Sequence, residues 1–203
     1  MNRCEIRLSG AGGQGMITAG IILAEAALYE NDLFVTQTQS YGPESRGGAS
    51  RAEVILSREV IDYPKVNQPD ILVALTQEAF DRYCHDVKVN GVIIVDQNID
   101  TAPMQANIQA RLYPLPILQN AEKVIGKKLT ANVLALGILA SFLDQIKTAS
   151  LEKAITRRVP PHTIDLNLQA FRLGAEISPG GSDQCGWEGY KHGRATMVGE
   201  HVW

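Results

Sequence analysis

Six residues near the N-terminus, Gly10-Ala11-Gly12-Gly13-Gln14-Gly15, have a spacing that suggests ligand binding. Their G-x-G-x-x-G pattern is typical of a phosphate-binding turn between a strand and a helix. Glycines let the backbone approach an anion, and the following helix offers free N–H groups and a partial positive charge. The same turn can also pack a strand on a helix without a ligand, so both interpretations stay open. The candidate cofactor-binding residues of this segment are Gly10, Gly12, Gly13, Gln14 and Gly15.

A second candidate segment is the loop between Ser40 and Ser50, which places an aromatic ring, a carboxylate and a guanidinium among residues that bend the backbone. Arg46 could hold a phosphate or a carboxylate through two hydrogen bonds. An ordinary surface loop would explain the same composition, although long loops in compact domains are often functional. The candidate binding residues of this loop are Tyr41, Glu44, Arg46, Gly47 and Gly48.

A dinucleotide site needs one further feature, an acidic side chain about 20 residues later that binds the ribose hydroxyls. It belongs at the end of the second strand, which reads Phe34-Val35-Thr36-Gln37-Thr38-Gln39, whereas Asp32 precedes that strand. No evident proton-transfer pair or substrate domain follows. These observations disfavour a free-standing NAD-dependent dehydrogenase, and we expect no catalytic residue in this chain.

The cysteines and histidines do not form a metal-binding pattern. Cys4, Cys84 and Cys185 are scattered, and no two of them have the C-x-x-C spacing of a zinc or redox site. Cys84 and His85 are adjacent, but neighbouring residues point in different directions on a helix or a strand, which disfavours a shared role. We therefore expect no metal site, and the odd cysteine count suits a reducing cytoplasm.

The overall composition limits the class of protein. The 203 residues are 45% hydrophobic and 20% charged, as in ordinary globular proteins. The net charge of −3 argues against a nucleic-acid partner. No run of eighteen apolar residues occurs, and the N-terminal residues lack the apolar stretch of a signal peptide. We expect a cytoplasmic protein that neither spans nor binds a membrane.

Alternating strands and helices would position the two candidate segments. The predicted strands show either period-two alternation or short apolar runs, and they cover residues 3–8, 33–39, 51–56, 70–75 and 92–95. An Ala-rich apolar helix, 16–28, follows the glycine turn, and Thr76 caps a short helix through Tyr83. This order predicts an α/β fold with a Rossmann-like, mostly parallel sheet and helices on both faces.

Helices dominate the last third of the chain. They are predicted at 120–125, 130–143 and 150–158, and in a final helix that Thr163 caps and Gly174 ends. The composition changes after Ile177, because residues 178–203 contain 6 of the 18 glycines and both tryptophans. We predict one Rossmann-like domain, 1–177, and a glycine-rich tail, 178–203, that is disordered or bound to a partner.

Several motifs occur together over residues 3–177. They are the glycine turn, Thr36 to Gly48, Asp62-Tyr63-Pro64, Arg158-Val159-Pro160-Pro161 and Asn167-Leu168-x-Ala170-Phe171. In combination they resemble the gamma subunit of 2-oxoacid:ferredoxin oxidoreductases. The loop Thr-Gln-Ser-Tyr-Gly-Pro-Glu-Ser-Arg-Gly-Gly looks like the 2-oxoglutarate type. Pyruvate-type loops usually end in Arg-Arg-Gly-Ala, and the indolepyruvate type lacks Tyr-Gly-Pro-Glu.

The resemblance implies one accessory part of an enzyme that oxidatively decarboxylates 2-oxoglutarate to succinyl-CoA. Thiamine diphosphate and magnesium would lie between alpha and beta catalytic subunits, and iron–sulfur clusters in partner subunits would pass electrons to ferredoxin. A ferredoxin-like delta subunit is a further partner that the resemblance suggests. This chain would dock on the catalytic subunits and help to hold coenzyme A, with Arg46 on a phosphate of the cofactor or on a partner carboxylate.

Three alternatives remain at this stage. The chain could belong to an enzyme for pyruvate, indolepyruvate or another aryl 2-oxoacid. It could be a purely structural subunit, because an empty Rossmann-like domain needs the same glycines. It could also be a free-standing nucleotide-binding protein, which would bind nucleotide in isolation.

Overall fold

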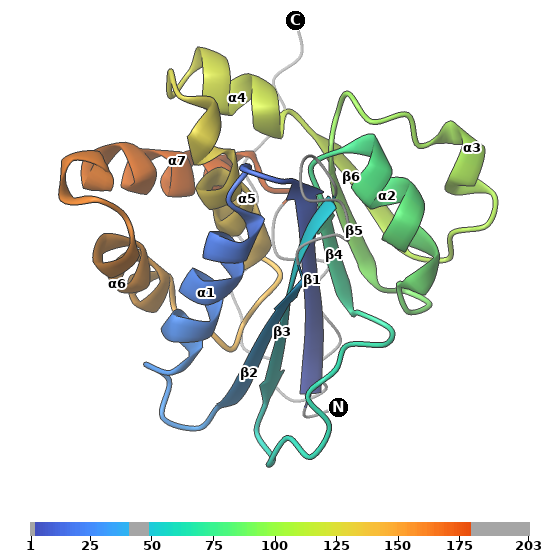
Figure 1. Cartoon of the computed structure of the whole chain (residues 1–203), viewed down its shortest axis with the longest axis horizontal. Helices are drawn as coiled ribbons and strands as arrows, with labels where there is room; N and C mark the ends of the chain where they lie inside the picture. The colour runs from blue at the N-terminus through green and yellow to red at the C-terminus, as the bar shows by residue number, and fades with distance from the viewer. Residues whose placement is uncertain (1–2, 41–48, 180–203) are drawn as a thin grey trace, which may run out of the picture.

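A computed structural model describes residues 3–40 and 49–179. Six strands form one sheet in the order β2-β3-β1-β4-β5-β6 (Figure 1). The strands are β1 (Arg3–Ala11), β2 (Phe34–Ser40), β3 (Ala49–Ser57), β4 (Ile71–Ala74), β5 (Val92–Asp96) and β6 (Arg111–Leu115). The α-helices are α1 (Met16–Ala27), α2 (Gln77–Tyr83), α3 (Ala102–Gln105), α4 (Ile117–Lys123), α5 (Ala131–Ala140), α6 (Thr148–Arg158) and α7 (Ile164–Ile177). Short 3-10 helices are η1 (Cys84–Asp86), η2 (Lys128–Thr130) and η3 (Pro161–Thr163).

The sheet is mostly parallel, as the alternation of strands and helices predicts. Strands β1, β4, β5 and β6 run in parallel, whereas β3 is antiparallel to both of its neighbours, β1 and β2. In a simple βαβ unit the second strand would lie directly beside the first. Here β3 separates them, so the end of β2 lies one strand farther from the glycine turn than a dinucleotide site requires.

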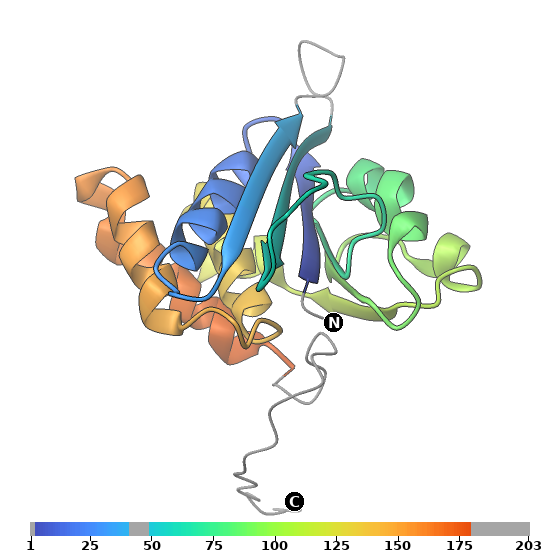
Figure 2. The same cartoon turned by 90° about the horizontal axis from the view of Figure 1, so that it is seen from below.

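Helices cover both faces of the sheet, as expected. Helices α1 and α4 to α7 lie on one side, and α2 and α3 lie on the other (Figure 2). The alternation in β1 accounts for the first of these layers, because Cys4, Ile6 and Leu8 all point into the larger core. A smaller core between the sheet and α2 contains Leu72 and Phe80.

Of the three predicted helix caps, Thr76 is confirmed, Thr163 has the predicted position but does not cap through its side chain, and Gly174 is wrong. The Thr76 hydroxyl accepts a hydrogen bond from the Ala79 N–H and so caps α2. Thr163 occupies the N-cap position of α7, but its hydroxyl donates to the Pro160 carbonyl and does not cap the helix. Gly174 does not end α7, which continues to Ile177. Gly126 follows α4 with a positive φ of 80°, a conformation that favours glycine after a helix.

The sequence patterns missed β6 and α3 and shifted other boundaries. Strand β6 contains Pro114 and lies at a sheet edge, so it lacks both an apolar run and a regular alternation. Helices α4 and α6 begin before the predicted first residues, Asn120 and Ser150. The buried Glu30 carboxylate accepts from the Lys147 N–H at 3.0 Å and from the Ser150 hydroxyl at 2.7 Å. A distant residue thus fixes the start of α6.

Two expectations fall partly outside the described residues. The predicted loop residues 41–48 lie outside them, and so do residues 180–203 of the predicted tail. The division into a domain and a tail therefore remains a prediction.

No helix in the described part of the chain is long and apolar enough to cross a membrane.

Candidate functional site

The glycine turn joins β1 to α1 through left-handed backbone. Gly13 has φ +88° and Gly15 has φ +75°, values that favour glycine over any residue with a Cβ. The Gln14 N–H donates to the Ala11 carbonyl at 3.1 Å, and the Gln14 Oε1 accepts from the Ala11 N–H at 2.8 Å. Gln14 therefore closes the turn on itself, and Gly12 and Gly13 form its exposed tip.

The turn glycines have different local roles. A Cβ at Gly15 would lie 2.5 Å from Asn132 Nδ2, which also donates to the Gly15 carbonyl at 3.0 Å. A Cβ at Gly10 would lie 2.5 Å from the Gln14 Oε1 atom. Side chains thus pack closely on Gly10 and Gly15, whereas Gly12 and Gly13 are the turn glycines that present exposed backbone to an incoming group.

A groove of about 700 Å³ opens beside this turn, at the carboxyl ends of β1 and β5. The turn, the segment after β5, helix α4 and η2 form its walls. The lining residues, which we call the carboxyl-end groove, are Gly13, Gln14, Gln97, Asn98, Leu118, Gln119, Glu122, Lys123, Lys128 and Leu129. Open α/β sheets bind ligands outside the carboxyl ends of their strands, where neighbouring connections leave toward opposite faces. In this sheet the connection after β1 leads to α1 on one face, and the connection after β4 leads to α2 on the other face (Figure 2).

A buried carboxylate fixes one wall of the carboxyl-end groove. Asp96 ends β5 and is 0% exposed. Its Oδ1 atom accepts from the backbone N–H of Asn98 at 3.0 Å and from the Asn98 side chain at 2.7 Å. Its Oδ2 atom accepts from the Leu118 N–H at 2.8 Å, in the first turn of α4. Asp96 therefore holds the segment after β5 against α4 without entering the groove itself.

The polar groups of the carboxyl-end groove suit an anionic ligand with hydrogen-bonding edges. Lys123 is exposed in the last turn of α4, and the Lys128 ammonium lies 3.1 Å from the Glu122 carboxylate. The Gln97 amide donates to the Gln119 Oε1 atom at 2.7 Å. Sequence reasoning found Gly13 and Gln14 but missed these residues. The available signal was Asp96, the polar residue that ends an otherwise apolar strand.

The second candidate segment lies outside the described residues, so Tyr41, Glu44, Arg46, Gly47 and Gly48 have no described geometry. The residues on either side of this segment belong to described strands. Ala49 pairs with Ala11 at the carboxyl end of β1, and Ser40 pairs with Arg51. Both ends of the segment therefore join the sheet at the same end as the glycine turn.

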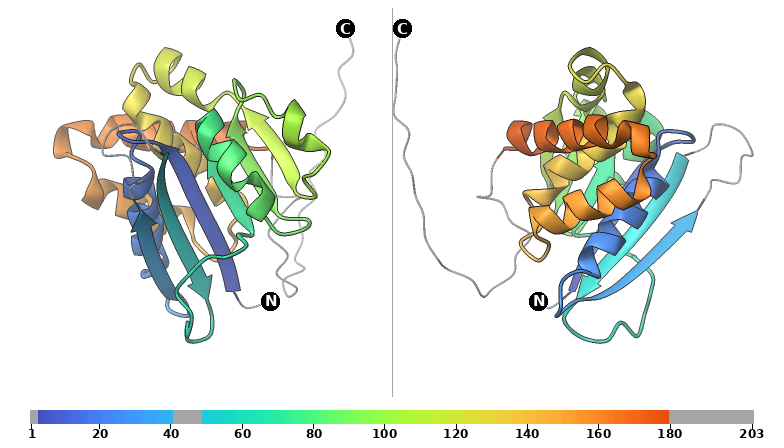
Figure 3. Two further views of the ribbon diagram at one scale, coloured as in Figure 1. Left: turned by 45° about the vertical axis from the view of Figure 1, so that its right-hand side comes forward. Right: turned by 90° about the vertical axis from the view of Figure 1, so that its left-hand side faces the viewer.

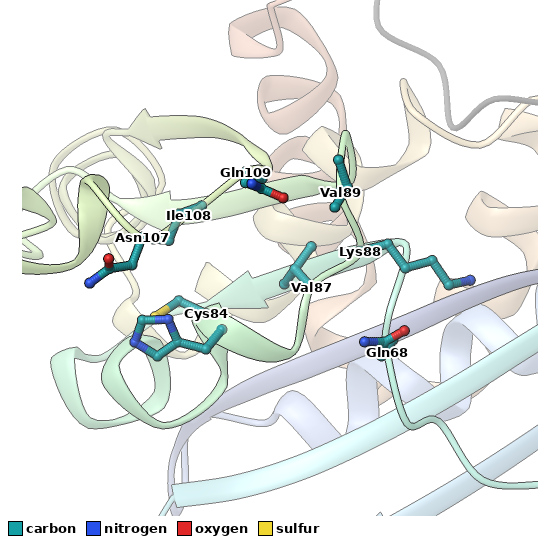
Figure 4. Close-up of a pocket in the computed structure, with 9 residues that line it drawn as sticks. Gln68, Cys84, Val87, Lys88, Val89, Asn107, Ile108 and Gln109 are labelled. Atoms are coloured by element: carbon teal, nitrogen blue, oxygen red, sulfur yellow. The ribbon is translucent and has the colours of Figure 1, made fainter.

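A smaller hollow of about 240 Å³ lies among Cys84, Lys88, Asn107 and other residues (Figure 4). Cys84 is buried and His85 is exposed, although both side chains line this hollow. Burial and the nearby Asp81 charge raise the pKa of the Cys84 thiol, which disfavours a reactive thiolate. Within residues 3–40 and 49–179, no three His, Cys, Asp or Glu side chains gather as metal ligands would.

The sequence and fold identify the family. A family model described as pyruvate ferredoxin/flavodoxin oxidoreductase matches residues 5–177, and the chain belongs to this family. Over 177 residues it is 47% identical to 2-oxoglutarate synthase subunit KorC of Methanocaldococcus jannaschii. The aligned region covers 87% of this chain and 94% of that protein. The resemblance to the gamma-subunit family that the motifs indicate is therefore confirmed.

Two solved structures have the same fold. The gamma subunit of a keto/oxoacid ferredoxin oxidoreductase from Geobacter sulfurreducens PCA is 42% identical, with a TM-score of 0.74 over 86% of this chain and 98% of that chain. A 2-oxoglutarate:ferredoxin oxidoreductase from Magnetococcus marinus, with 2-oxoglutarate, coenzyme A and succinyl-CoA bound, is 24% identical. Its TM-score is 0.76 over 88% of this chain and 31% of that chain. This second likeness concerns the fold alone.

Proposed function

We propose that this chain is the gamma subunit of a coenzyme A-dependent 2-oxoglutarate:ferredoxin oxidoreductase. The observation that carries the proposal is the 47% identity to a 2-oxoglutarate synthase subunit over almost the whole of that protein. The complex would convert 2-oxoglutarate to succinyl-CoA and CO₂ in the cytoplasm and pass the electrons to ferredoxin. Alpha and beta partner subunits would hold thiamine diphosphate and magnesium, and partner subunits that include a ferredoxin-like delta subunit would hold the iron–sulfur clusters.

Turnover of the purified complex with a panel of 2-oxoacids tests the substrate. We expect coenzyme A-dependent dye reduction with 2-oxoglutarate at a kcat/KM at least tenfold above that with pyruvate, 2-oxoisovalerate or indolepyruvate. Detection of succinyl-CoA by mass would identify the product. A higher kcat/KM with any other acid would move the assignment to that substrate, and a chain that co-purifies with no other subunit would contradict the complex itself.

We further propose that the carboxyl-end groove helps to hold coenzyme A. That cofactor carries several phosphates and an adenine with donor and acceptor groups. Lys123 and Lys128 provide cations for the phosphates, and the exposed Gly12–Gly13 tip leads into the first turn of α1, where backbone N–H groups lack helical partners. Asn98 and the glutamines provide amides for the adenine edge. Arg46 stays a further candidate for a phosphate of coenzyme A or a partner carboxylate.

Replacing both groove lysines, as Lys123→Gln with Lys128→Gln, is expected to raise the KM for coenzyme A about tenfold, or about 1.4 kcal/mol. The kcat should change less than twofold, because the lysines would contact parts of coenzyme A remote from its reacting thiol. The matched control is Lys65→Gln, which removes one exposed lysine outside the groove. Steady-state kinetics of the assembled complex would measure both constants, and an unchanged KM would favour a purely structural subunit.

A further inference from the structure

The two edges of the sheet are protected differently against pairing with another strand. Natural edge strands usually carry charges, prolines or bulges that prevent such pairing. Strand β6 contains Arg111 and Pro114, whereas the seven residues of β2, Phe34–Ser40, include no charge and no proline. Among the described residues, β2 pairs only with β3. Strand β2 therefore offers an open edge that can accept a further strand.

A hollow of about 380 Å³ lies beside this edge and is lined by residues of β2, α1 and the end of α6. The ribbons of these three elements lie side by side (Figure 3, right). Its apolar side chains include Ile21 and Leu28, and Gln37 of β2 borders it. Leu28 is 66% exposed, although it is a large apolar residue. Phe34, at the start of β2, is 48% exposed. Its side chain points to the face of the sheet away from α1, because its neighbour Val35 packs in the larger core on the α1 side.

The rim of the hollow carries more positive than negative charge. Arg157 and Arg158 both contact the carboxylate of Glu25, whose side chain is 10% exposed. Lys153 lies 4.1 Å from the centre of the Tyr29 ring, which also lines the hollow. Burial raises the pKa of Glu25, but hydrogen bonds from Tyr29 and Arg158 outweigh this effect, so its pKa is lowered. Glu25 is therefore charged at neutral pH, and two arginines contact this one carboxylate while Lys153 adds a third cation beside Tyr29.

We propose that β2 and this hollow receive an extended, acidic segment of a catalytic partner subunit, which adds a strand to the sheet. Backbone hydrogen bonds to β2 would give affinity, and alternate side chains would enter the hollow and give specificity. Its carboxylates would pair with Arg157 and Arg158, which are 64% and 50% exposed and keep donors free for a second acceptor. The docking surface consists of β2 with Leu28, Phe34, Arg157 and Arg158.

A second copy of this chain fits the docking surface poorly. Its own β2 would bring no carboxylate to the arginines, because that strand is uncharged. Two copies related by a two-fold axis present the same patch to each other, so the cationic rims would approach one another. The charge pattern therefore favours a different, acidic chain. This inference rests on the proposed function, which supplies catalytic subunits as partners.

Photo-crosslinking in the assembled complex tests the docking surface directly. A benzoylphenylalanine at position 28 is expected to form a covalent adduct with a catalytic subunit, at a peptide that contains aspartate or glutamate. The matched control is position 89, because Val89 is 63% exposed and lines the hollow that contains Cys84. An adduct with a second copy, an adduct within the same chain, or no adduct at position 28 in an intact complex would each overturn the inference.

A charge pair at one position gives an independent test. We expect Leu28→Glu to weaken retention of this chain in the complex at least tenfold on dilution, measured by native mass spectrometry. Leu28→Lys should weaken it less than threefold, because lysine keeps the positive rim, and Val89→Glu should have no effect. If wild-type chain does not co-purify with catalytic subunits, the proposed function fails. If it does and Leu28→Glu is retained as well as Leu28→Lys, only the docking surface is wrong.

Discussion

Replacing Gly174 by alanine is expected to lower the free energy of unfolding by about 3 kcal/mol or more, or to prevent folding. A Cβ at this position would lie 2.0 Å from the Leu134 carbonyl oxygen, where α7 crosses α5. The same crossing places a Cβ of residue 137 at 1.9 Å from the Phe171 carbonyl oxygen. Both obstacles are backbone atoms, so the helices would have to move apart and expose core side chains.

Thermal and urea unfolding of the purified protein would measure this effect. The control is Gly126→Ala, since Gly126 has a positive φ but an added Cβ there meets nothing within 4 Å. That variant carries backbone strain without overpacking and should cost about 1 kcal/mol. Equal stability of the two alanine variants would show that the helices can separate freely, contrary to this account of the α5–α7 contact.

Replacing Arg7 by methionine is expected to destabilise the fold by about 3–5 kcal/mol, because it removes one partner of a buried ion pair. Arg7 is 3% exposed, and its Nε donates to the Glu53 carboxylate at 2.8 Å. Its Nη1 contacts the Asp86 carboxylate, and its Nη2 donates to the Val66 carbonyl at 2.9 Å. The guanidinium also lies 4.9 Å from the centre of the Tyr83 ring. Without it, Glu53 would be left buried with fewer partners.

A second substitution separates the ion pair from ordinary packing. Arg7→Met combined with Glu53→Leu should recover part of the lost stability, because the buried carboxylate is then removed together with its partner, and the remaining Asp86 side chain is 44% exposed to water. Arg58→Met is the exposed control, since Arg58 and Asp32 are 52% and 64% exposed and lie 3.4 Å apart. That pair should contribute less than about 1 kcal/mol. Equal losses in denaturant unfolding for Arg7→Met and Arg58→Met would contradict the buried network.

Local signals predicted much of the fold. The alternation of Cys4, Ile6 and Leu8 identified β1, and apolar runs identified β4 and β5. The glycines after β1 marked a turn that needs left-handed backbone at Gly13 and Gly15. Each of these signals is contained within a few neighbouring residues, because side-chain period and allowed φ are local properties.

Other features depend on contacts between distant residues and carried no local signal. Gly174 resembles a helix end in the sequence, but in the structure it is the site where α7 approaches α5. Strand β6 is recognisable only through its pairing with β5. The lysines of the carboxyl-end groove look like any exposed charges until α4 and η2 are placed beside the glycine turn.

By itself, the sequence determined the α/β class, the strand–turn–helix that starts the domain, and the gamma-subunit family. Only the tertiary structure decided that β3 separates β1 from β2, and that Gly15 packs against Asn132, 117 residues later. It also decided which turn glycines face outward and which edge of the sheet stays open. The physical reason is that periodicity and backbone freedom are written in adjacent residues, whereas grooves and open edges arise from how whole elements pack.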